Sequence, residues 1–279
     1  MRLMLPQRFR GLTYLEAFRL LASKLPRYFA LLPRWLLFRL FNRRLLGLKE
    51  IGEPVQGELN RVLARKEEVL QSLLKLSEGG RILEVGIGEF PELHRMELIL
   101  ANRIQYTGCD FQRVCEAHQL QLKLAGFDVS RIKFASNAVG TYAWTLFDML
   151  VDREMFDLIY LDGHHTFYVD LPAFTLVHHL LRPGGYIMVD DIQWTLMFLK
   201  RNMVRRFTTW CYYKDMYSFS DYTLAQLSEP HLKKITEALL LARNGYSLVR
   251  DFSTQWWWVL RKPTTTRPET APTKSDILA

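Results

Sequence analysis

The 279-residue sequence has few cysteines and no long apolar run. Its three cysteines, Cys109, Cys115 and Cys211, form no CxxC pair and are odd in number, which argues against a disulfide framework and favours a reducing, cytoplasmic setting. No uninterrupted apolar stretch approaches the roughly 20 residues that a membrane-spanning helix needs, and no segment resembles a signal-cleavage site. The 49% hydrophobic content is instead typical of a globular protein with a sizeable core.

The sequence also has no net positive charge outside its first 50 residues. Of the net charge of +8, residues 1–50 hold 11 Lys and Arg against 2 Asp and Glu, which is +9. The other 229 residues hold 26 against 27, which is −1. Because the main part of the chain is not basic, it offers no obvious surface for tracking phosphates, and we expect no nucleic-acid partner.

Residues 1–50 form a basic arm in which arginines alternate with aromatic and leucine-rich clusters. Four of its apolar residues lie at helical spacing: Tyr14, Phe18, Leu21 and Leu25. A basic amphipathic helix with aromatic residues on its apolar face suits peripheral contact with a membrane surface or with an acidic partner. The alternative is a pair of helices that pack on the domain or on a second subunit of a homo-oligomer, and the sequence leaves both open.

Residues 51–262 read as one α/β domain, and residues 263–279 as a disordered tail. After an amphipathic helix over 55–76, five strand patterns alternate with helix patterns, which predicts a doubly wound parallel sheet. Two further strands, YSLVRDF and QWWWVLRK, follow near the end. Residues 192–228 interrupt the pattern with many aromatic residues, and we expect this insertion to lie over the ligand-binding edge of the sheet. The alternative is that its aromatic side chains pack against the sheet or against a second subunit.

A glycine turn follows the first strand of the predicted sheet. Glu84 lies in that strand, and Gly86 and Gly88 lie in the turn that leads to a helix, where backbone can approach a ligand closely. The third glycine of the dinucleotide pattern is replaced by Pro91, which disfavours a nicotinamide-dependent dehydrogenase. Asp110 ends the second strand 24 residues after Gly86, where an acid can bind both hydroxyls of a ribose.

Acidic residues end the fourth and fifth predicted strands. Asp162 follows DLIYL, and a helix over 169–181, the turn RPGG and the strand YIMV then lead to Asp190 and Asp191. The carboxyl ends of parallel strands share one edge of the sheet, so the three carboxylates should meet, and their repulsion favours a bound cation. Each aspartate alone is often only a helix cap. His164 and His165 follow Asp162 directly, and we expect one of the two to be structural.

Residues 81–262 resemble the class I S-adenosylmethionine-dependent methyltransferases. The resemblance implies a Rossmann-like α/β sheet of seven strands, mostly parallel, in which the last strand is antiparallel. It also implies that Glu84, Gly86 and Gly88 hold the methionyl part of the cofactor, that Asp110 holds the ribose, and that Asn137 and Ala138, which end the third strand, meet the adenine. Phe90 stands where the family often has glycine, and Asn137 replaces a more usual aspartate.

Within this class the acidic stretch is similar to the metal-dependent O-methyltransferases of the catechol and macrolide-sugar types. This similarity implies that Asp162, Asp190 and Asp191 bind a divalent cation, usually Mg²⁺, and that Asp162 and His165 are the catalytic residues. The macrolide-sugar type carries histidine three positions after the first aspartate, and His165 matches that position. The residues agree with this chemistry, because an oxygen-ligated Mg²⁺ can acidify a hydroxyl whose proton a histidine then takes.

The sequence therefore favours a Mg²⁺-dependent O-methyltransferase that acts on a hydroxylated small molecule, a sugar or a lipid-linked glycan. A non-catalytic methyltransferase-like domain that the arm recruits to a membrane is the alternative, and the acidic triad argues against it. RNA methylation is disfavoured by the charge balance, as a nicotinamide dehydrogenase is by the missing glycine.

Overall fold

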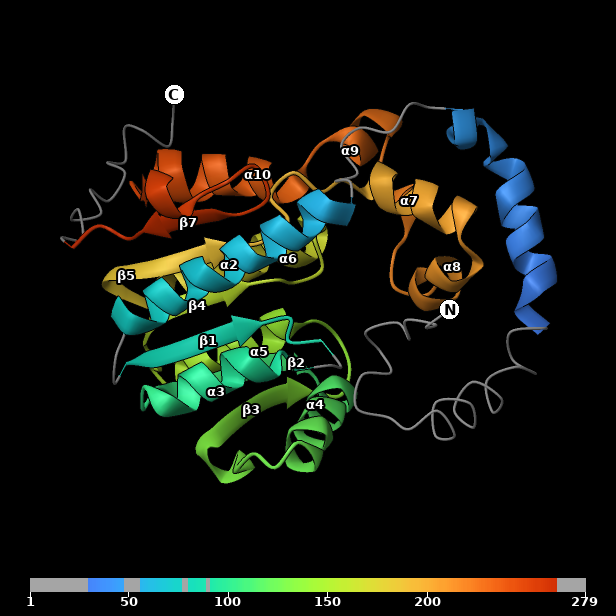
Figure 1. Cartoon of the computed structure of the whole chain (residues 1–279). Coiled ribbons are helices and arrows are strands. Elements are labelled where there is room, and N and C mark those ends of the chain that lie inside the picture. Colours follow the sequence, from blue (N-terminus) through green and yellow to red (C-terminus); the bar gives the residue numbers. More distant parts are fainter. Residues whose placement is uncertain (1–29, 48–55, 77–79, 89–90, 265–279) are drawn as a thin grey trace. The chain divides into compact units, whose positions relative to one another are not determined.

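The structure is a computed structural model that describes residues 30–47, 56–76, 80–88 and 91–264 (Figure 1). The chain divides into two compact units. One comprises residues 1–55 and 195–229, and the other comprises residues 56–194 and 230–279. The predicted amphipathic helix around Tyr14 and nearly all of the predicted C-terminal tail lie outside the described residues.

The larger unit is built on a seven-stranded sheet whose order is β3-β2-β1-β4-β5-β7-β6. Its strands are β1 (Arg81–Val85), β2 (Gln105–Phe111), β3 (Ile132–Asn137), β4 (Phe156–Leu161), β5 (Leu181–Val189), β6 (Ser247–Leu248) and β7 (Trp258–Arg261). The first five strands pair in parallel, whereas β7 is antiparallel to both of its neighbours, β5 and β6. The predicted fold class, a Rossmann-like sheet that is mostly parallel with an antiparallel last strand, is confirmed.

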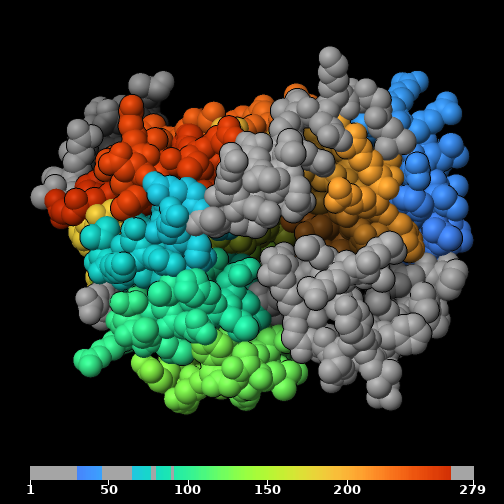
Figure 2. All heavy atoms as spheres, in the orientation of Figure 1, coloured from blue at the N-terminus to red at the C-terminus, as the bar shows by residue number. Residues whose placement is uncertain are grey.

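Helices cover both faces of this sheet, because the central strands carry apolar side chains on both faces. In β4, Leu158 and Tyr160 belong to one core cluster and Ile159 and Leu161 to the other. The first cluster includes residues of α2 (Gln56–Leu76) and α3 (Leu93–Ala101), which lie side by side in Figures 1 and 2. The second includes residues of α5 (Tyr142–Val151), α6 (Phe167–Leu180) and α10 (His231–Ile235). Next to β2 and β3 lies α4 (Gln112–Leu124), and a π-helical segment, Thr236–Arg243, continues α10.

The segment RPGG differs from its prediction as a turn. α6 ends at Leu180, and Arg182–Gly185 already belong to β5, where the pairing with β4 shifts register between Phe156 and Leu158. Gly184 has φ +79, so the glycine pair supplies a left-handed residue to an irregular strand start and not to a separate loop.

The smaller unit combines the end of the arm with the aromatic insertion. Residues 30–41 are helical and precede a 3₁₀ turn, Arg43–Gly47. The insertion forms α7 (Leu196–Arg205), α8 (Phe207–Tyr213), a 3₁₀ turn (Phe219–Asp221) and α9 (Leu224–Ser228). Trp35 joins the two pieces, because its indole Nε1 donates to Met203 O at 2.9 Å and its ring lies edge-on to Phe207 at 5.5 Å. Among the described residues, no helix is long and apolar enough to cross a membrane.

The turn after β1 approaches β4 so closely that residue 86 has no room for a side chain. A Cβ on Gly86 would lie 2.0 Å from the carbonyl oxygen of Asp162, and Gly86 has φ +86. Gly88 has φ +67, but a Cβ there would meet nothing within 4 Å. Gly86 is therefore required by packing as well as by conformation, whereas Gly88 is required by conformation alone.

We expect Gly86→Ala to destabilise the protein more than Gly88→Ala does. Each substitution forces alanine into a left-handed conformation at a cost of roughly 1–2 kcal/mol, and only Gly86→Ala adds a clash with rigid backbone. Urea unfolding of the two variants measures the difference. Equal losses of unfolding free energy would show that the contact with Asp162 does not constrain the turn.

Candidate active site

The sheet's hydrogen-bonding pattern continues one residue beyond the carboxyl ends of its central strands. Gly86 N donates to Cys109 O, Asp162 N to Val85 O and Asp190 N to Leu161 O, each at 2.9 Å. These bonds place the residues that follow β1, β4 and β5 along one edge of the sheet. The ends of β4 and β5, which carry Asp162 and Asp190, thus lie at one edge, as the sequence predicted.

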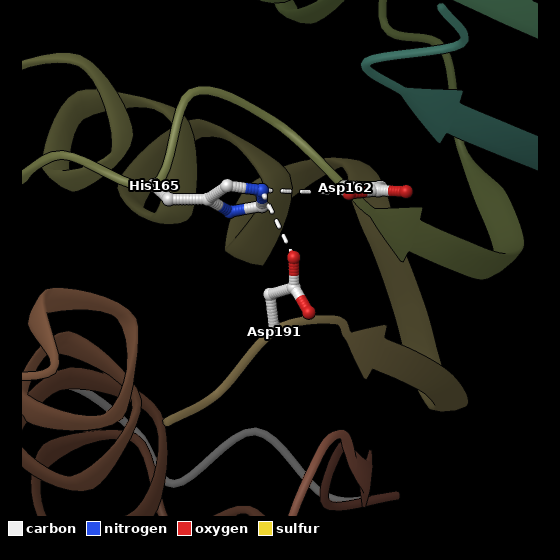
Figure 3. Close-up of side chains that lie close together, drawn as sticks. All are labelled: Asp162, His165 and Asp191. Atoms are coloured by element: carbon white, nitrogen blue, oxygen red, sulfur yellow. Dashed lines mark ion pairs between the residues drawn. The ribbon is translucent and has the colours of Figure 1, made fainter. Parts of the chain in front are cut away.

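Three side chains converge at this edge: Asp162, His165 and Asp191 (Figure 3). His165 Nε2 lies 3.6 Å from Asp162 Oδ1 and 3.6 Å from Asp191 Oδ2. One ligand atom from each residue lies within 4.8 Å of the other two, which is close enough for one metal ion to contact all three. The imidazole is only 11% exposed, whereas the Asp162 and Asp191 side chains are 35% and 46% exposed, so the cluster is open on the carboxylate side.

Two members of this cluster have unfavourable backbone conformations. His165 has φ 62 and Asp191 has φ 48, and among the described residues only two other non-glycine residues have positive φ. Such conformations cost energy and persist where the surrounding structure fixes them. His165 packs against Trp194 with ring centroids 5.1 Å apart, and its Nδ1 is buried without a hydrogen-bond partner in the described part of the chain. Packing therefore orients the imidazole and leaves Nε2 facing the carboxylates.

Asp190, the third predicted metal ligand, has different partners. It is 5% exposed, forms an ion pair with Lys66 of α2, and accepts a hydrogen bond from Tyr160 Oη at 2.6 Å. Burial alone would raise the pKa of Asp190, but the ammonium of Lys66 and the hydrogen bonds hold it below its ordinary value. The structure thus brings Asp162 and Asp191 together at His165 and pairs Asp190 with a lysine.

The two carboxylates beside His165 are incompletely neutralised. Burial and the neighbouring Asp190 charge raise the pKa of Asp162, although Lys66 and His165 oppose this. Burial also raises the pKa of Asp191, against the effect of His165. A raised carboxylate pKa means that the negative charge is costly there, so a further cation at this point would be stabilised.

His164 has a different environment from His165. Its Nδ1 lies 2.8 Å from Thr166 Oγ1, and its backbone N donates to Tyr142 Oη at 3.1 Å. The buried Asp170 accepts hydrogen bonds from Tyr142 Oη and from Thr166 N and so fixes the loop between β4 and α6. Sequence reasoning missed both Tyr142 and Asp170.

The residues predicted to bind a cofactor lie at or just past the carboxyl ends of β1, β2 and β3. Asp110 Oδ2 accepts from Gly88 N at 3.3 Å, so the acid near the end of β2 lies against the glycine turn. The carbonyl of Gly88 also accepts from His118 Nδ1 at 3.0 Å, and burial lowers the pKa of this histidine. Asn137 Oδ1 accepts from Thr145 Oγ1 at 2.9 Å, which ties the end of β3 to α5.

A cavity opens beside this second group of residues. Its volume is about 380 Å³, and Phe111, Gln112, Arg113, Glu116 and Ala138 line it. The cavity therefore lies between the ends of β2 and β3 and the first turns of α4, next to Asp110.

Glu84 is less available than the sequence suggested. It is 7% exposed; Oε1 accepts from Arg95 Nη1 at 2.8 Å, and Oε2 accepts from Tyr106 Oη at 2.7 Å. Both of its oxygens thus already bond to side chains of α3 and β2. These contacts give Glu84 a structural role beneath the glycine turn, and its contact with a cofactor stays a prediction.

Residues 96–192, which run from α3 past β5, match the sequence model of a family described as a methyltransferase domain. This segment holds Asp110, Asn137 and the whole Asp162, His165 and Asp191 cluster. No curated protein matches the chain in sequence.

Several solved structures have a related chain path. An O-methyltransferase from Bacillus cereus in complex with SAH is 14% identical with a TM-score of 0.45, and the match covers 84% of this chain and 91% of that one. A protein from Staphylococcus aureus described as a caffeoyl-CoA O-methyltransferase is 13% identical with a TM-score of 0.46, covering 89% and 99%. The MycE methyltransferase of the mycinamycin pathway is 16% identical with a TM-score of 0.45, covering 81% and 53%. The match of residues 96–192 to the methyltransferase-domain family confirms the predicted resemblance to methyltransferases.

Proposed function

We propose that this protein is an S-adenosylmethionine-dependent O-methyltransferase that methylates a hydroxyl of a small molecule or sugar with the help of a divalent cation. The observation that carries this proposal is the convergence of Asp162, His165 and Asp191 at the sheet edge where the glycine turn also lies. The match of residues 96–192 to a methyltransferase-domain family supports the same class of reaction.

The cofactor is assigned to the carboxyl ends of β1, β2 and β3 and the turns that follow them. Gly86 and Gly88 carry no side chains, so cofactor can approach their backbone, and the carboxylate of Asp110 can accept hydrogen bonds from both ribose hydroxyls. Asn137 and Ala138 would meet the adenine, and the cavity beside Ala138 is of a size typical of small-molecule sites. We retain Glu84 as a predicted neighbour of the methionyl part, acting through the turn that it supports.

The residues beside His165 fit a divalent cation, because two carboxylates with raised pKa face one point. Asp162 and Asp191 would hold it, and Mg²⁺ is commonly bound by one or two carboxylates together with water. When bound, such an ion lowers the pKa of a ligated hydroxyl and fixes its position. The partial exposure of both carboxylates leaves room for an acceptor oxygen.

His165 is proposed as the general base. Its Nε2 faces the same point as the two carboxylates and, in the neutral tautomer protonated at Nδ1, can take the proton of the acceptor hydroxyl. S-adenosylmethionine, when bound, would supply the methyl group to the oxygen that His165 deprotonates. Asp162 and Asp191 stabilise the imidazolium that forms. His164 has no such part, because its ring lies against Thr166.

The assignment of Asp110 predicts the affinity for the cofactor. Asp110→Ala should weaken binding of S-adenosylmethionine by about 1.5–3 kcal/mol, because hydrogen bonds to a charged group are lost. Isothermal calorimetry with S-adenosylmethionine and its demethylated product measures this. Asp128→Ala is a matched control, since Asp128 is exposed and caps the 3₁₀ turn at Val129–Arg131. Wild-type protein that binds NAD and not S-adenosylmethionine would refute the assignment.

The assignment of His165 predicts a loss of rate without a loss of cofactor. His165→Ala should reduce kcat roughly 10²- to 10⁴-fold, which is the usual contribution of one acid or base group, and should leave S-adenosylmethionine affinity unchanged. His164→Ala is the matched control and should have a much smaller effect. Activity is measured with a panel of hydroxylated acceptors. A His165→Ala variant with full activity would remove the base assignment.

The helix over residues 30–41 favours a second proposal, peripheral attachment to an anionic membrane. One side of this helix packs through Trp35 and Phe38, and four neighbouring large apolar side chains are more than half exposed. These are Leu36, Leu37, Leu40 and Phe41. Arg39, Arg43 and Arg44 are exposed on the same stretch, so an apolar row is accompanied by positive charge, which suits anionic lipid headgroups.

The paired substitution of Leu37 and Phe41 by Ser should reduce co-sedimentation with anionic vesicles, and salt should weaken the binding of the wild type. Leu224→Ser is the matched control, because Leu224 is 70% exposed in α9 without neighbouring arginines. Substitution is preferable to truncation, since deleting the helix would also remove the packed Trp35. Equal pelleting with anionic and neutral vesicles would contradict the proposal.

A further inference from the structure

Lys66 occupies a position where a charge is unusual. It lies on α2 at helical spacing before Val69, Leu70 and Leu73, which are 1%, 3% and 0% exposed, so the face that carries it is turned toward the sheet. Its side chain is only 17% exposed. Burying an unpaired ammonium costs free energy, so Lys66 needs a partner of opposite charge.

The partner of Lys66 is the carboxylate of Asp190, whose two oxygens are both occupied. Oδ2 receives the Lys66 ammonium and the hydroxyl of Tyr160, and Oδ1 accepts from the backbone N of Asp191 at 3.0 Å. Lys66 Nζ also lies 5.4 Å from the centre of the Tyr160 ring, and Arg95 Cζ lies 5.2 Å from the same ring centre. The tyrosine ring thus contacts two cations while its hydroxyl bonds to Asp190.

Two ion pairs lie in this buried group. Arg95 is paired with Glu84, and Lys66 with Asp190. Asp162 and Asp191 have no lysine or arginine partner among the described residues. Each lies 3.6 Å from His165 Nε2, and Asp162 Oδ2 also accepts from Tyr160 Oη at 3.3 Å. The acidic triad that the sequence predicts is therefore divided into a neutralised carboxylate and an open pair.

We propose that Lys66 is a resident counter-ion that removes Asp190 from the metal-ligand set, so that an added divalent cation is held by Asp162 and Asp191 without Asp190. This inference rests on the proposed function, whose metal site it specifies. Lys66 acts as a positioning residue, because it pairs with Asp190 and so occupies that carboxylate. Removing its ammonium frees the Asp190 carboxylate, which then adds a third negative ligand to the site.

Binding of Mn²⁺, followed by the electron paramagnetic resonance signal of the free ion, tests this without cofactor or acceptor. Asp191→Asn should weaken Mn²⁺ binding roughly tenfold or more, the scale on which metal sites respond to altered ligation. The double variant Lys66→Met with Asp190→Asn removes both members of the buried pair together, which proteins often tolerate. It should bind Mn²⁺ within about twofold of the wild type, as expected for a group outside the ligand set.

The single variant Lys66→Met gives a second readout that a purely structural lysine would not produce. Its free Asp190 should tighten Mn²⁺ binding, and Mn²⁺ should raise the Tm of this variant more than that of the wild type, because a ligand stabilises the state that binds it. If Lys66→Met does not fold, the double variant decides.

Two results would overturn the inference. One is a double variant that loses Mn²⁺ binding as severely as Asp191→Asn, which would make Asp190 a ligand. The other is a wild type that binds S-adenosylmethionine but no Mn²⁺, which would leave the proposed cofactor site standing and make Lys66 the sufficient cation. Loss of S-adenosylmethionine binding itself would instead contradict the proposed function.

Discussion

The backbone hydrogen bonds that extend the sheet past its central strands are the constraint on which the site depends. Asp162 N to Val85 O and Asp190 N to Leu161 O hold the residues after β4 and β5 in line with the turn after β1. Gly86 then touches the carbonyl of Asp162 so closely that the turn and the acidic edge form one rigid piece. The positions of the functional groups are thus set by main chain, which is stiffer than any side-chain contact.

Side chains that hold this edge come from both faces of the sheet. On one face, Tyr160 and Glu84 are neighbours in register across β4 and β1, and they meet Lys66 and Arg95 from the covering helices. On the other face, Asp170 and Tyr142 fix the loop that carries the two histidines. The ion pairs of Lys66 and Arg95 thus support the edge from one face, and the hydrogen-bonded Tyr142 supports it from the other. The partly exposed carboxylates of Asp162 and Asp191 lie at the edge itself.

The sequence predicted those parts of the fold that depend on local pattern. Apolar runs that end in Asp110 and Asp162 marked the strand ends, and the alternation of strands and helices predicted the sheet. It did not show which way Asp190 and Asp191 point, because adjacent residues after a strand diverge and Asp191 adopts φ 48. Lys66 was missed because charges on an amphipathic helix are normally solvated. Its helical spacing to Val69 and Leu73 indicated that Lys66 lies on the buried face of the helix. That spacing points to an ion pair only once Asp190 is known to lie opposite.

The smaller unit is assembled from segments far apart in the chain. Trp35 Nε1 bonds to the carbonyl of Met203, which lies 168 residues later, and residues 195–229 leave and rejoin the larger unit between β5 and α10. During synthesis the helix over 30–41 emerges long before its partner, since translation at about 5–20 residues per second leaves many seconds between the two. Throughout that interval the indole of Trp35 lacks the residues that later cover it. The completed insertion buries Trp35, whereas Leu36, Leu37, Leu40 and Phe41 stay exposed in the finished structure.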